Sequence, residues 1–349
     1  MTRAAGERGS RMSRVAPAGR RHWLAAVGLG LAAWASAWAQ PASQPAAVAF
    51  PTRPVSLVTA FAPGSGPDAV LRLVADKLGR AWPGQRLTVD NKPGGGGFIA
   101  IEAVRRAAPD GHTLLQLDSE HLAALPHLYK ARGFETLKAF EPVAVLFRTP
   151  FLVAVAADAP WKTVGELLAA AKAAPDKLSF GSWGVGSPGH LGAEQIELLT
   201  GAQMQHVPFR EVSQLFTAVG SGEPAWSFAS IPSSQGAYKA GKLRYLAVAA
   251  AKRLPQLPEV PTVGEAGGPA GLEVNSFVVL VAPRGLPPAV RNAIHTAVRQ
   301  AVAEPDVQAR FQTFAFETLP WSPEEIERQA AAKSKVYAEL VKRKAISLD

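Results

Sequence analysis

The stretch PVSLVTAFAPGSGPDAVLRLVADKL, residues 54–78, joins a β-rich run to a helical run through a loop of glycine, serine and proline. Apolar side chains recur at helical spacing in its second half, which predicts an amphipathic helix after the first strand. In the loop FAPGSGPD (61–68) we expect Gly66 to cap that helix and Pro67 to take its first position. Such backbone freedom with so few side-chain atoms suits either a tight turn or an anion that approaches free N–H groups.

The alternation of strand and helix continues along the chain. Short β-rich runs such as LTVDN (87–91) and FLVAVAA (151–157) are separated by helical segments. Alternating elements predict parallel sheets in an α/β fold, and two sets of them predict two lobes. We expect residues 51–150 and 281–349 to form the first lobe, and residues 151–280 to form a second lobe inserted into it.

The N-terminus has the organisation of a secretory signal peptide. Residues 1–22 carry six arginines and one glutamate, and the apolar run 23–39 follows. The small residues Ala37 and Ala39 predict cleavage after Ala39, with cleavage after Ala37 as the alternative. A retained membrane anchor is the competing interpretation, and the paired arginines leave both the Sec and the twin-arginine export routes open. Residues 40–50 are expected to be a flexible lead-in.

Composition narrows the class of partner. The formal net charge is +9, but removing the predicted signal peptide, residues 1–39, leaves 31 basic and 27 acidic residues and a charge of about +4. The mature chain has no stripe of lysine and arginine interleaved with aromatic residues, which argues against a nucleic-acid partner. Its lack of cysteine excludes disulfides, thiolate metal sites and a cysteine nucleophile.

Four loops each connect a predicted strand to the helix that follows it, and α/β sheets bind their ligands at such loops. In the last of them we expect Ser187 to cap the helix and Pro188 to take its first position. Free N–H groups and the helix dipole attract anions, so four such loops predict an anion-binding cradle between the lobes. The alternative for any single loop is that its glycines only turn the chain. The loops are FAPGSGPD (61–68), NKPGGGGF (91–98), LDSEH (117–121) and GSWGVGSPGH (181–190).

The sequence patterns of common enzymes are absent or incomplete. NKPGGGG lacks the Gly-Lys-Ser/Thr ending of a P-loop, and GVGSPG is not a Gly-x-Ser-x-Gly nucleophile elbow. Ser187 and His190 have the spacing of a helix cap, since a catalytic serine needs a base that approaches from elsewhere. We therefore expect no catalytic residue, no metal and no cofactor. The histidines interpreted as structural or exposed, without zinc-ligand spacing, are His112, His121, His127, His190 and His206.

Longer motifs follow one another in a specific order. They are FPTRPVSLVTAFAPGSGPDAVLRLVADKL, VDNKPGGGGFIAIEAVRRAAPDGHTLL, LSFGSWGVGSPGHLGAEQIELLTGAQMQHVPF and AGKLRYLAVAAAKRLPQLPEVPTVGEAG. With them, nearly the whole mature chain resembles the Bug-type receptors, the periplasmic substrate-binding proteins of tripartite tricarboxylate transporters. The resemblance implies a two-lobed periplasmic-binding-protein fold (type II-like) with a hinge and an interlobe ligand cleft. It also implies a periplasmic monomer that captures a small carboxylate and delivers it to membrane permease subunits.

The resemblance also assigns ligand contacts, in which hydroxyls and backbone N–H groups donate to carboxylate oxygens. Asp68 is an acceptor, so it is expected to cap its own helix or to order water rather than to contact the anion. The residues assigned from the first lobe are Ala62, Gly64, Ser65, Gly66, Asp68, Gly96, Gly97 and Ser119. Those assigned from the second lobe are Ser182, Gly186, Ser187 and His190.

Several positions depart from the family pattern. Pro67 removes a hydroxyl and an N–H, and Ala229 stands where relatives often have an aspartate that can meet ligand amines. Phe98 and Glu120 replace small or polar residues. These changes predict a less polar pocket, which favours a plain or aromatic carboxylate over an amino acid. A sensor component of a two-component system is an alternative function, and an exported enzyme is the least favoured one.

Overall fold

The computed structural model describes residues 49–349. The predicted signal peptide, with Ala37 and Ala39, lies outside the described residues, as do residues 40–48 of the lead-in. Within residues 49–349, no helix is both long enough and apolar enough to cross a bilayer.

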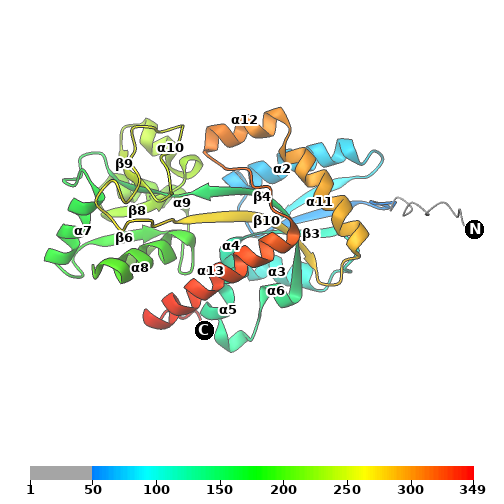
Figure 1. The fold of residues 1–349 in the computed structure, drawn as a ribbon, viewed down its shortest axis with the longest axis horizontal. Coiled ribbons are helices and arrows are strands. Elements are labelled where there is room, and N and C mark those ends of the chain that lie inside the picture. Colours follow the sequence, from blue (N-terminus) through cyan, green and yellow to red (C-terminus); the bar gives the residue numbers. More distant parts are fainter. Residues whose placement is uncertain (1–48) are drawn as a thin grey trace, which may run out of the picture. The chain divides into compact units, whose positions relative to one another are not determined.

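The first of two sheets has five strands in the order β2-β1-β3-β10-β4 (Figure 1). Strand β1 pairs in parallel with β2 and β3, whereas β10 runs antiparallel to β3 and β4. In this register Leu57 lies between Val89 and Leu114. The strands are β1 (Val55–Thr59), β2 (Leu87–Asn91), β3 (Thr113–Asp118), β4 (Phe140–Pro150) and β10 (Asn275–Pro283).

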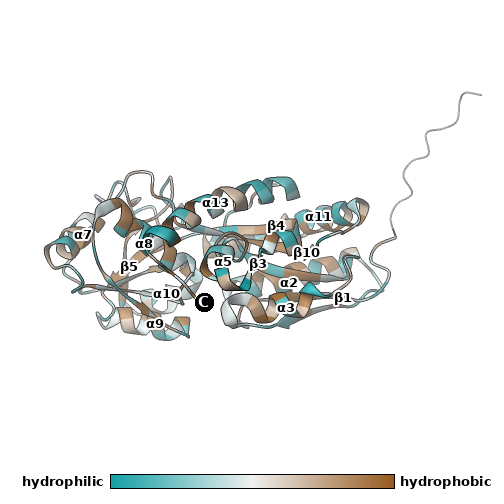
Figure 2. Ribbon diagram, turned by 90° about the horizontal axis from the view of Figure 1, so that it is seen from below, coloured by the Kyte–Doolittle hydropathy of each residue, from teal (hydrophilic) through white to brown (hydrophobic). Residues whose placement is uncertain are grey.

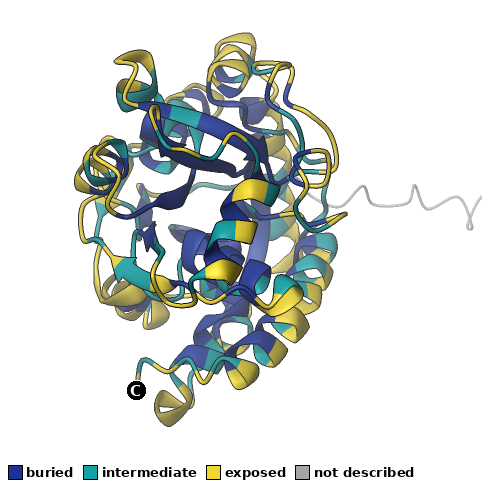
Figure 3. Cartoon of the chain, turned by 90° about the vertical axis from the view of Figure 1, so that its left-hand side faces the viewer, coloured by how far each residue is buried: buried dark blue, intermediate teal, exposed yellow. Residues whose placement is uncertain are grey.

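Helices cover both faces of this sheet, because successive side chains of a strand point to opposite faces. Leu57 packs in one apolar core with residues of α2, α11 and α12, while its neighbour Val58 packs with residues of α3 and α13. Figure 3 shows the strands buried inside a layer of partly exposed helices. The helices are α2 (Gly66–Ala81), α3 (Phe98–Arg105), α4 (Ser119–Ala123), α5 (Leu125–Leu128), α6 (Thr136–Ala139), α11 (Pro288–Val302), α12 (Pro305–Phe314) and α13 (Pro323–Arg343), with the 3₁₀ turns η2 (Gly95–Gly97) and η3 (Lys130–Arg132).

The second sheet has the order β7-β6-β8-β5-β9. Strand β6 is parallel to β7 and β8, and β5 is antiparallel to β8 and β9. Alternate residues again face different cores: Val155 packs with Trp226, and Ala154 packs with Leu215. The elements are β5 (Leu152–Ala156), α7 (Val164–Ala173), β6 (Ser179–Ser182), α8 (Pro188–Thr200), β7 (Gln205–Pro208), α9 (Val212–Gly220), β8 (Trp226–Ala229), α10 (Ile231–Lys239) and β9 (Leu243–Val248).

The chain passes between the sheets in two places. Strand β4 ends at Pro150 in the first sheet, and β5 begins at Leu152 in the second. After β9 the chain returns as β10, whose first residue Asn275 already pairs in the first sheet and lies within the stretch assigned from sequence to the second lobe. The second sheet is therefore inserted into the first, and the predicted α/β fold with two lobes is confirmed. The expectation of parallel sheets is wrong, because each sheet also contains antiparallel pairs: β10 with β3 and β4 in the first, and β5 with β8 and β9 in the second.

The C-terminal helix α13 contacts elements of both sheets. Its first half buries Ile326 and Ala330 against the first sheet, and hydrophilic residues alternate with apolar ones along the helix (Figure 2). Beyond its end, the Lys344 ammonium lies 2.9 Å from a Glu194 oxygen and also pairs with Glu197, both on α8. The backbone N–H of Leu348 then donates to a carbonyl of α5 at 2.8 Å. The last residues of the chain thus hold α5 and α8 together.

Candidate functional site

Helix N-termini gather at one edge of each sheet. Helices α2, α3 and α4 follow β1, β2 and β3, which are parallel, so their N-termini share the carboxyl edge of the first sheet. Helices α8 and α10 follow β6 and β8, which are parallel in the second sheet. Such edges are where α/β proteins bind ligands, and all four loops selected from the sequence lie there.

The first loop is capped one residue earlier than expected. Helix α2 begins at Gly66, and Ser65 is its N-cap, with Oγ accepting from the N–H of Asp68 at 3.4 Å. The prediction of Gly66 as the cap is therefore wrong, because the serine hydroxyl supplies an acceptor that glycine lacks. The N–H of Gly66 has no acceptor among the described residues.

Asp68 is a buried acceptor that organises this loop. Its carboxylate accepts from the N–H of Gly64 at 2.8 Å, from Asn91 at 2.7 Å and from Arg72 at 3.1 Å. Burial opposes the charge, but these hydrogen bonds outweigh it and lower the pKa of Asp68. The N–H of Gly64, predicted to meet the ligand, is thus already bonded within the loop. Gly64 itself has φ +78°, and no atom lies within 4 Å of where its Cβ would be.

The glycines of the second loop make room for side chains. A Cβ on Gly96 would lie 2.7 Å from the Tyr129 hydroxyl oxygen. One on Gly97 would lie 2.2 Å from Cδ2 of His121. Real Cβ atoms do not approach so closely, so a larger residue at either position would force the neighbouring side chain to move. The loop therefore depends on glycine for contacts inside the protein, whatever its role toward a ligand.

Ser119 and Glu120 belong to a buried polar network. The hydroxyl of Ser119 lies 2.9 Å from Oε2 of Glu120 and 3.2 Å from the Ser276 hydroxyl, and the residue is fully buried. The other Glu120 oxygen accepts from Tyr337 at 2.8 Å and from Lys333 at 3.0 Å, both on α13. Burial and the Glu120 charge raise the pKa of Tyr337 well above its usual value. Glu120 thus points toward α13.

A second network underlies the loop of the second lobe. The hydroxyl of Ser182, which is fully buried, lies 2.7 Å from Nε2 of His206. The N–H of Gly186 donates to Nδ1 of His190 at 3.2 Å, and Nε2 of His190 lies 3.5 Å from Glu194. Burial, aided by the nearby His190, lowers the pKa of His206 to about 4. Ser182 is enclosed, so this serine–histidine pair offers no accessible nucleophile.

Ser187 occupies the predicted cap of α8. Its Oγ accepts from the N–H of His190 at 3.3 Å, and Pro188 follows at the first helical position. This confirms the capping arrangement expected from the spacing. The free N–H closest to the cap belongs to Gly189. The Trp183 ring packs against this glycine, since a Cβ there would lie 2.8 Å from the ring.

Sequence reasoning missed the N-terminus of α10. Ser230 caps it in a capping box with Ser233, and the N–H of Ile231 has no acceptor among the described residues. Pro232 approaches α2: a Cβ on Gly66 would lie 3.3 Å from its Cγ. The N-termini of α2 and α10, one from each lobe, therefore meet at Gly66. The sequence contained a signal for this site. Ser230 and Pro232 follow a strand, just as a serine and a proline follow a strand in two of the selected loops, SGP (65–67) and SPG (187–189).

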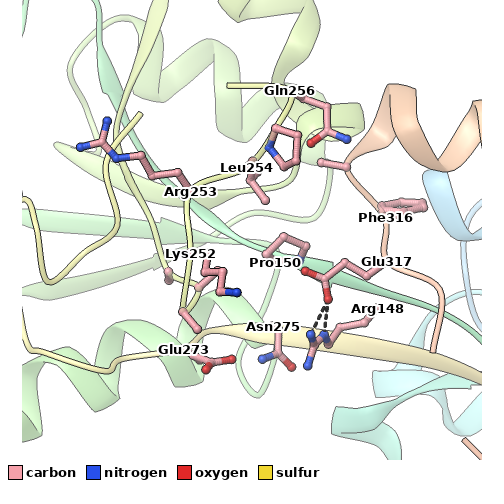
Figure 4. A pocket seen from close by; sticks show the side chains of 15 residues that line it. Arg148, Pro150, Lys252, Arg253, Leu254, Gln256, Glu273, Asn275, Phe316 and Glu317 are labelled. Carbon is pink, nitrogen blue, oxygen red and sulfur yellow. Dashed lines mark hydrogen bonds and ion pairs between the residues drawn. The ribbon is translucent and has the colours of Figure 1, made fainter. Parts of the chain in front are cut away.

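A pocket of about 610 Å³ lies where the chain crosses between the sheets (Figure 4). Arg148 and Glu317 form an ion pair in its wall, and Asn275 and Lys252 also line it. A second pocket of about 510 Å³ lies between α9 and α10. Neither is lined by any of the twelve predicted ligand residues. Across residues 49–349, no group of three or more potential ligands is placed to hold a metal ion.

Comparisons with known proteins agree on one family. The family model described as tripartite tricarboxylate transporter family receptor matches residues 56–346. A solved Rhodopseudomonas palustris protein with adipate is 30% identical, with a TM-score of 0.76, over 84% of this chain and 97% of that chain. MatC from the same organism, with bound malate, is 28% identical, with a TM-score of 0.75, over 84% of this chain and 100% of MatC. The periplasmic binding protein BugD is 28% identical, with a TM-score of 0.74, over 85% and 99%. The family and these structural neighbours are substrate-binding receptors, not enzymes.

Proposed function

The chain belongs to the tripartite tricarboxylate transporter receptor family, and on this premise we propose that it captures a small carboxylate between its lobes in the periplasm and delivers it to membrane permease subunits. It would do so as an exported monomer. The signal-like N-terminus supports export, and the adipate and malate bound by two structural neighbours support the ligand class.

The observation that carries the proposal is the meeting of α2 and α10 at Gly66. The N–H groups of Gly66 and Ile231, at the first positions of these helices, have no acceptors among the described residues. Each also carries the positive end of a helix dipole. A carboxylate placed there would accept from both lobes and so favour their closure, because only the closed arrangement brings both donors to one anion.

The predicted contacts divide into two groups under this proposal. Gly66 and Ser187, with Ala62 and Ser65, lie at helix mouths and are proposed to face the ligand. The remaining predicted residues are proposed to support the loops from behind, because their polar groups are already bonded or their side of the backbone is packed. This group comprises Gly64, Asp68, Gly96, Gly97, Ser119, Ser182, Gly186 and His190.

A thermal-unfolding screen with adipate, malate and benzoate tests the ligand class. A ligand that binds only the folded state stabilises it by about 2.7 kcal/mol at a hundredfold excess over Kd, which raises the melting temperature. The melting shift should change little with salt, because the interactions are enclosed on closure. If none of the acids shifts the melting temperature at millimolar concentration, the carboxylate proposal fails.

The delivery step needs its own experiment. Native mass spectrometry of freshly purified protein would identify a retained ligand by mass. Uptake of that ligand, labelled, would then be compared between cells with and without this protein and between cells with and without the permease subunits. Uptake that is lost in both deletions supports transport. Uptake that is unaffected by deletion of this protein would contradict it.

A further inference from the structure

His121 lies where the two glycine-rich loops of the first lobe meet. Its ring centre is 6.1 Å from that of Phe61, at an interplanar angle of 84°. On the other side, a Cβ on Gly97 would lie 2.3 Å from its Nε2. The edge of the imidazole ring therefore borders both loops at the carboxyl edge of the first sheet. It was interpreted from sequence as a structural or exposed histidine and was not assigned to the site.

One ring nitrogen of His121 is bonded and the other is free. Nδ1 lies 2.5 Å from Oδ1 of Asp118 and 3.4 Å from the backbone nitrogen of Asp118. One nitrogen cannot donate to the first and accept from the second, so the shorter contact fixes the proton on Nδ1, donated to the carboxylate. Nε2 has no partner among residues 49–349, and it is not one of the fully buried unpaired polar atoms in this part of the chain, so it keeps some contact with solvent. It is the polar atom that His121 offers to a ligand.

The surroundings favour the charged form of the ring. Burial opposes the charge, but the Asp118 carboxylate outweighs it and raises the pKa of His121, with a smaller contribution from Glu120. The positive charge of Lys333 on α13 helps to lower the pKa of Asp118, and Lys333 also forms an ion pair with Glu120. Phe61 and Gly97 bring no charge. With Nδ1–H directed at Asp118, the neutral ring would present a lone pair at Nε2, whereas the imidazolium presents an N–H donor.

We propose that His121 binds a carboxylate oxygen of the ligand through Nε2–H, as the positively charged donor of the first lobe. This inference rests on the proposed function and deepens it. It adds a charge-assisted hydrogen bond to the neutral N–H groups of the helix mouths. It also makes affinity depend on pH, because deprotonation replaces the donor at Nε2 by a lone pair that repels the carboxylate.

The test is the dissociation constant of adipate, measured by calorimetry on the purified protein between about pH 6.5 and 9, where adipate stays ionised. We expect the wild-type affinity to fall as pH rises through the pKa of the imidazolium. His121→Gln should bind about tenfold to hundredfold more weakly at the acidic end, and its affinity should not change with pH. The matched control is His295→Gln, in which a histidine of α11 bonded to the carbonyl of Val143 is replaced. It should keep the wild-type affinity and pH profile.

Asp118→Asn separates charge from capping. Asparagine caps helices as well as aspartate, so the N-terminus of α4 should persist while the anion that favours the imidazolium is lost. The midpoint of the affinity profile should then move to lower pH. This variant and the wild type decide the matter even if His121→Gln does not fold.

The possible outcomes are distinct. A folded His121→Gln protein that binds adipate as the wild type does would overturn the role of His121 and leave the carboxylate receptor intact. A flat wild-type pH profile, or an unmoved midpoint in Asp118→Asn, would do the same. If neither adipate nor any other acid of the thermal screen binds the wild type, the proposed function fails and this inference fails with it.

Discussion

Replacing Gly97 by alanine should destabilise the protein more than the same change at Gly64, and the difference should depend on His121. Both glycines have positive φ, +88° and +78°, where an L-residue costs roughly 1–2 kcal/mol. At Gly64 nothing lies within 4 Å of the added Cβ, so that cost is the whole effect. At Gly97 the Cβ would lie 2.2 Å from the His121 ring, and forcing an extra methyl into a packed site adds about 1–3 kcal/mol.

A double-mutant cycle isolates that added cost. In a His121→Ala background the ring is gone, so Gly97→Ala should cost only the roughly 1–2 kcal/mol of the strained φ. The coupling between the two sites is then about 1–3 kcal/mol. Urea unfolding measures each free energy, provided that the slopes with denaturant agree among variants. Equal costs for Gly97→Ala and Gly64→Ala in the wild-type background would show that His121 does not enforce glycine at this position.

Three further predictions concern the second lobe. Because burial and His190 lower the pKa of His206 to about 4, below its unfolded value of about 6.5, stability should be full above pH 6.5 and fall as the pH drops toward 4. In His206→Gln the melting temperature should depend less on pH over this range. A pH dependence equal to that of the wild type would contradict the role given to His206. Ser187→Ala should lower the free energy of unfolding, measured in urea, by about 1 kcal/mol, because the cap of α8 is lost. If Ser187 also contacts the ligand, the affinity for adipate should fall about tenfold, which is a loss of about 1.4 kcal/mol of binding free energy. Lys344→Met should lower the unfolding free energy by about 1–3 kcal/mol, because two partly buried carboxylates of α8 lose a charged partner; a melting temperature equal to that of the wild type would contradict it.

The sequence predicted those parts of the fold that depend on neighbours along the chain. The helical face of α2 is buried as its spacing indicated, and Ser187 caps α8 as its position before a proline indicated. The cap of α2 was placed one residue late, at Gly66 instead of Ser65. Serine and glycine both occur at caps, and their order in a short loop does not decide between them.

The rest depends on contacts between distant segments. The Ser119 hydroxyl meets Ser276, which is 157 residues away, and the Ser182 hydroxyl meets His206, which is 24 residues away. No spacing rule anticipates either pair. The same holds for Gly97, whose need for glycine comes from the ring of His121 rather than from a bound anion. Hydroxyls and glycines at helix mouths therefore predicted the location of a site, but not which groups remain free to serve it.

The end of the chain has a practical consequence for anyone who handles this protein. Leu348 donates to Leu128, and the Asp349 carboxylate accepts from the N–H of Ala131, so the final two residues are bonded into the surface of the first lobe. Lys344, a few residues earlier, is bonded to the second. An affinity tag or a fluorescent domain fused after Asp349 is therefore expected to strain the contacts that join the last residues to α5 and α8. A dye attached at the exposed turn of Gly84, between α2 and β2, would leave these contacts intact, because this turn precedes β2 and so lies at the edge of the first sheet opposite the proposed ligand site.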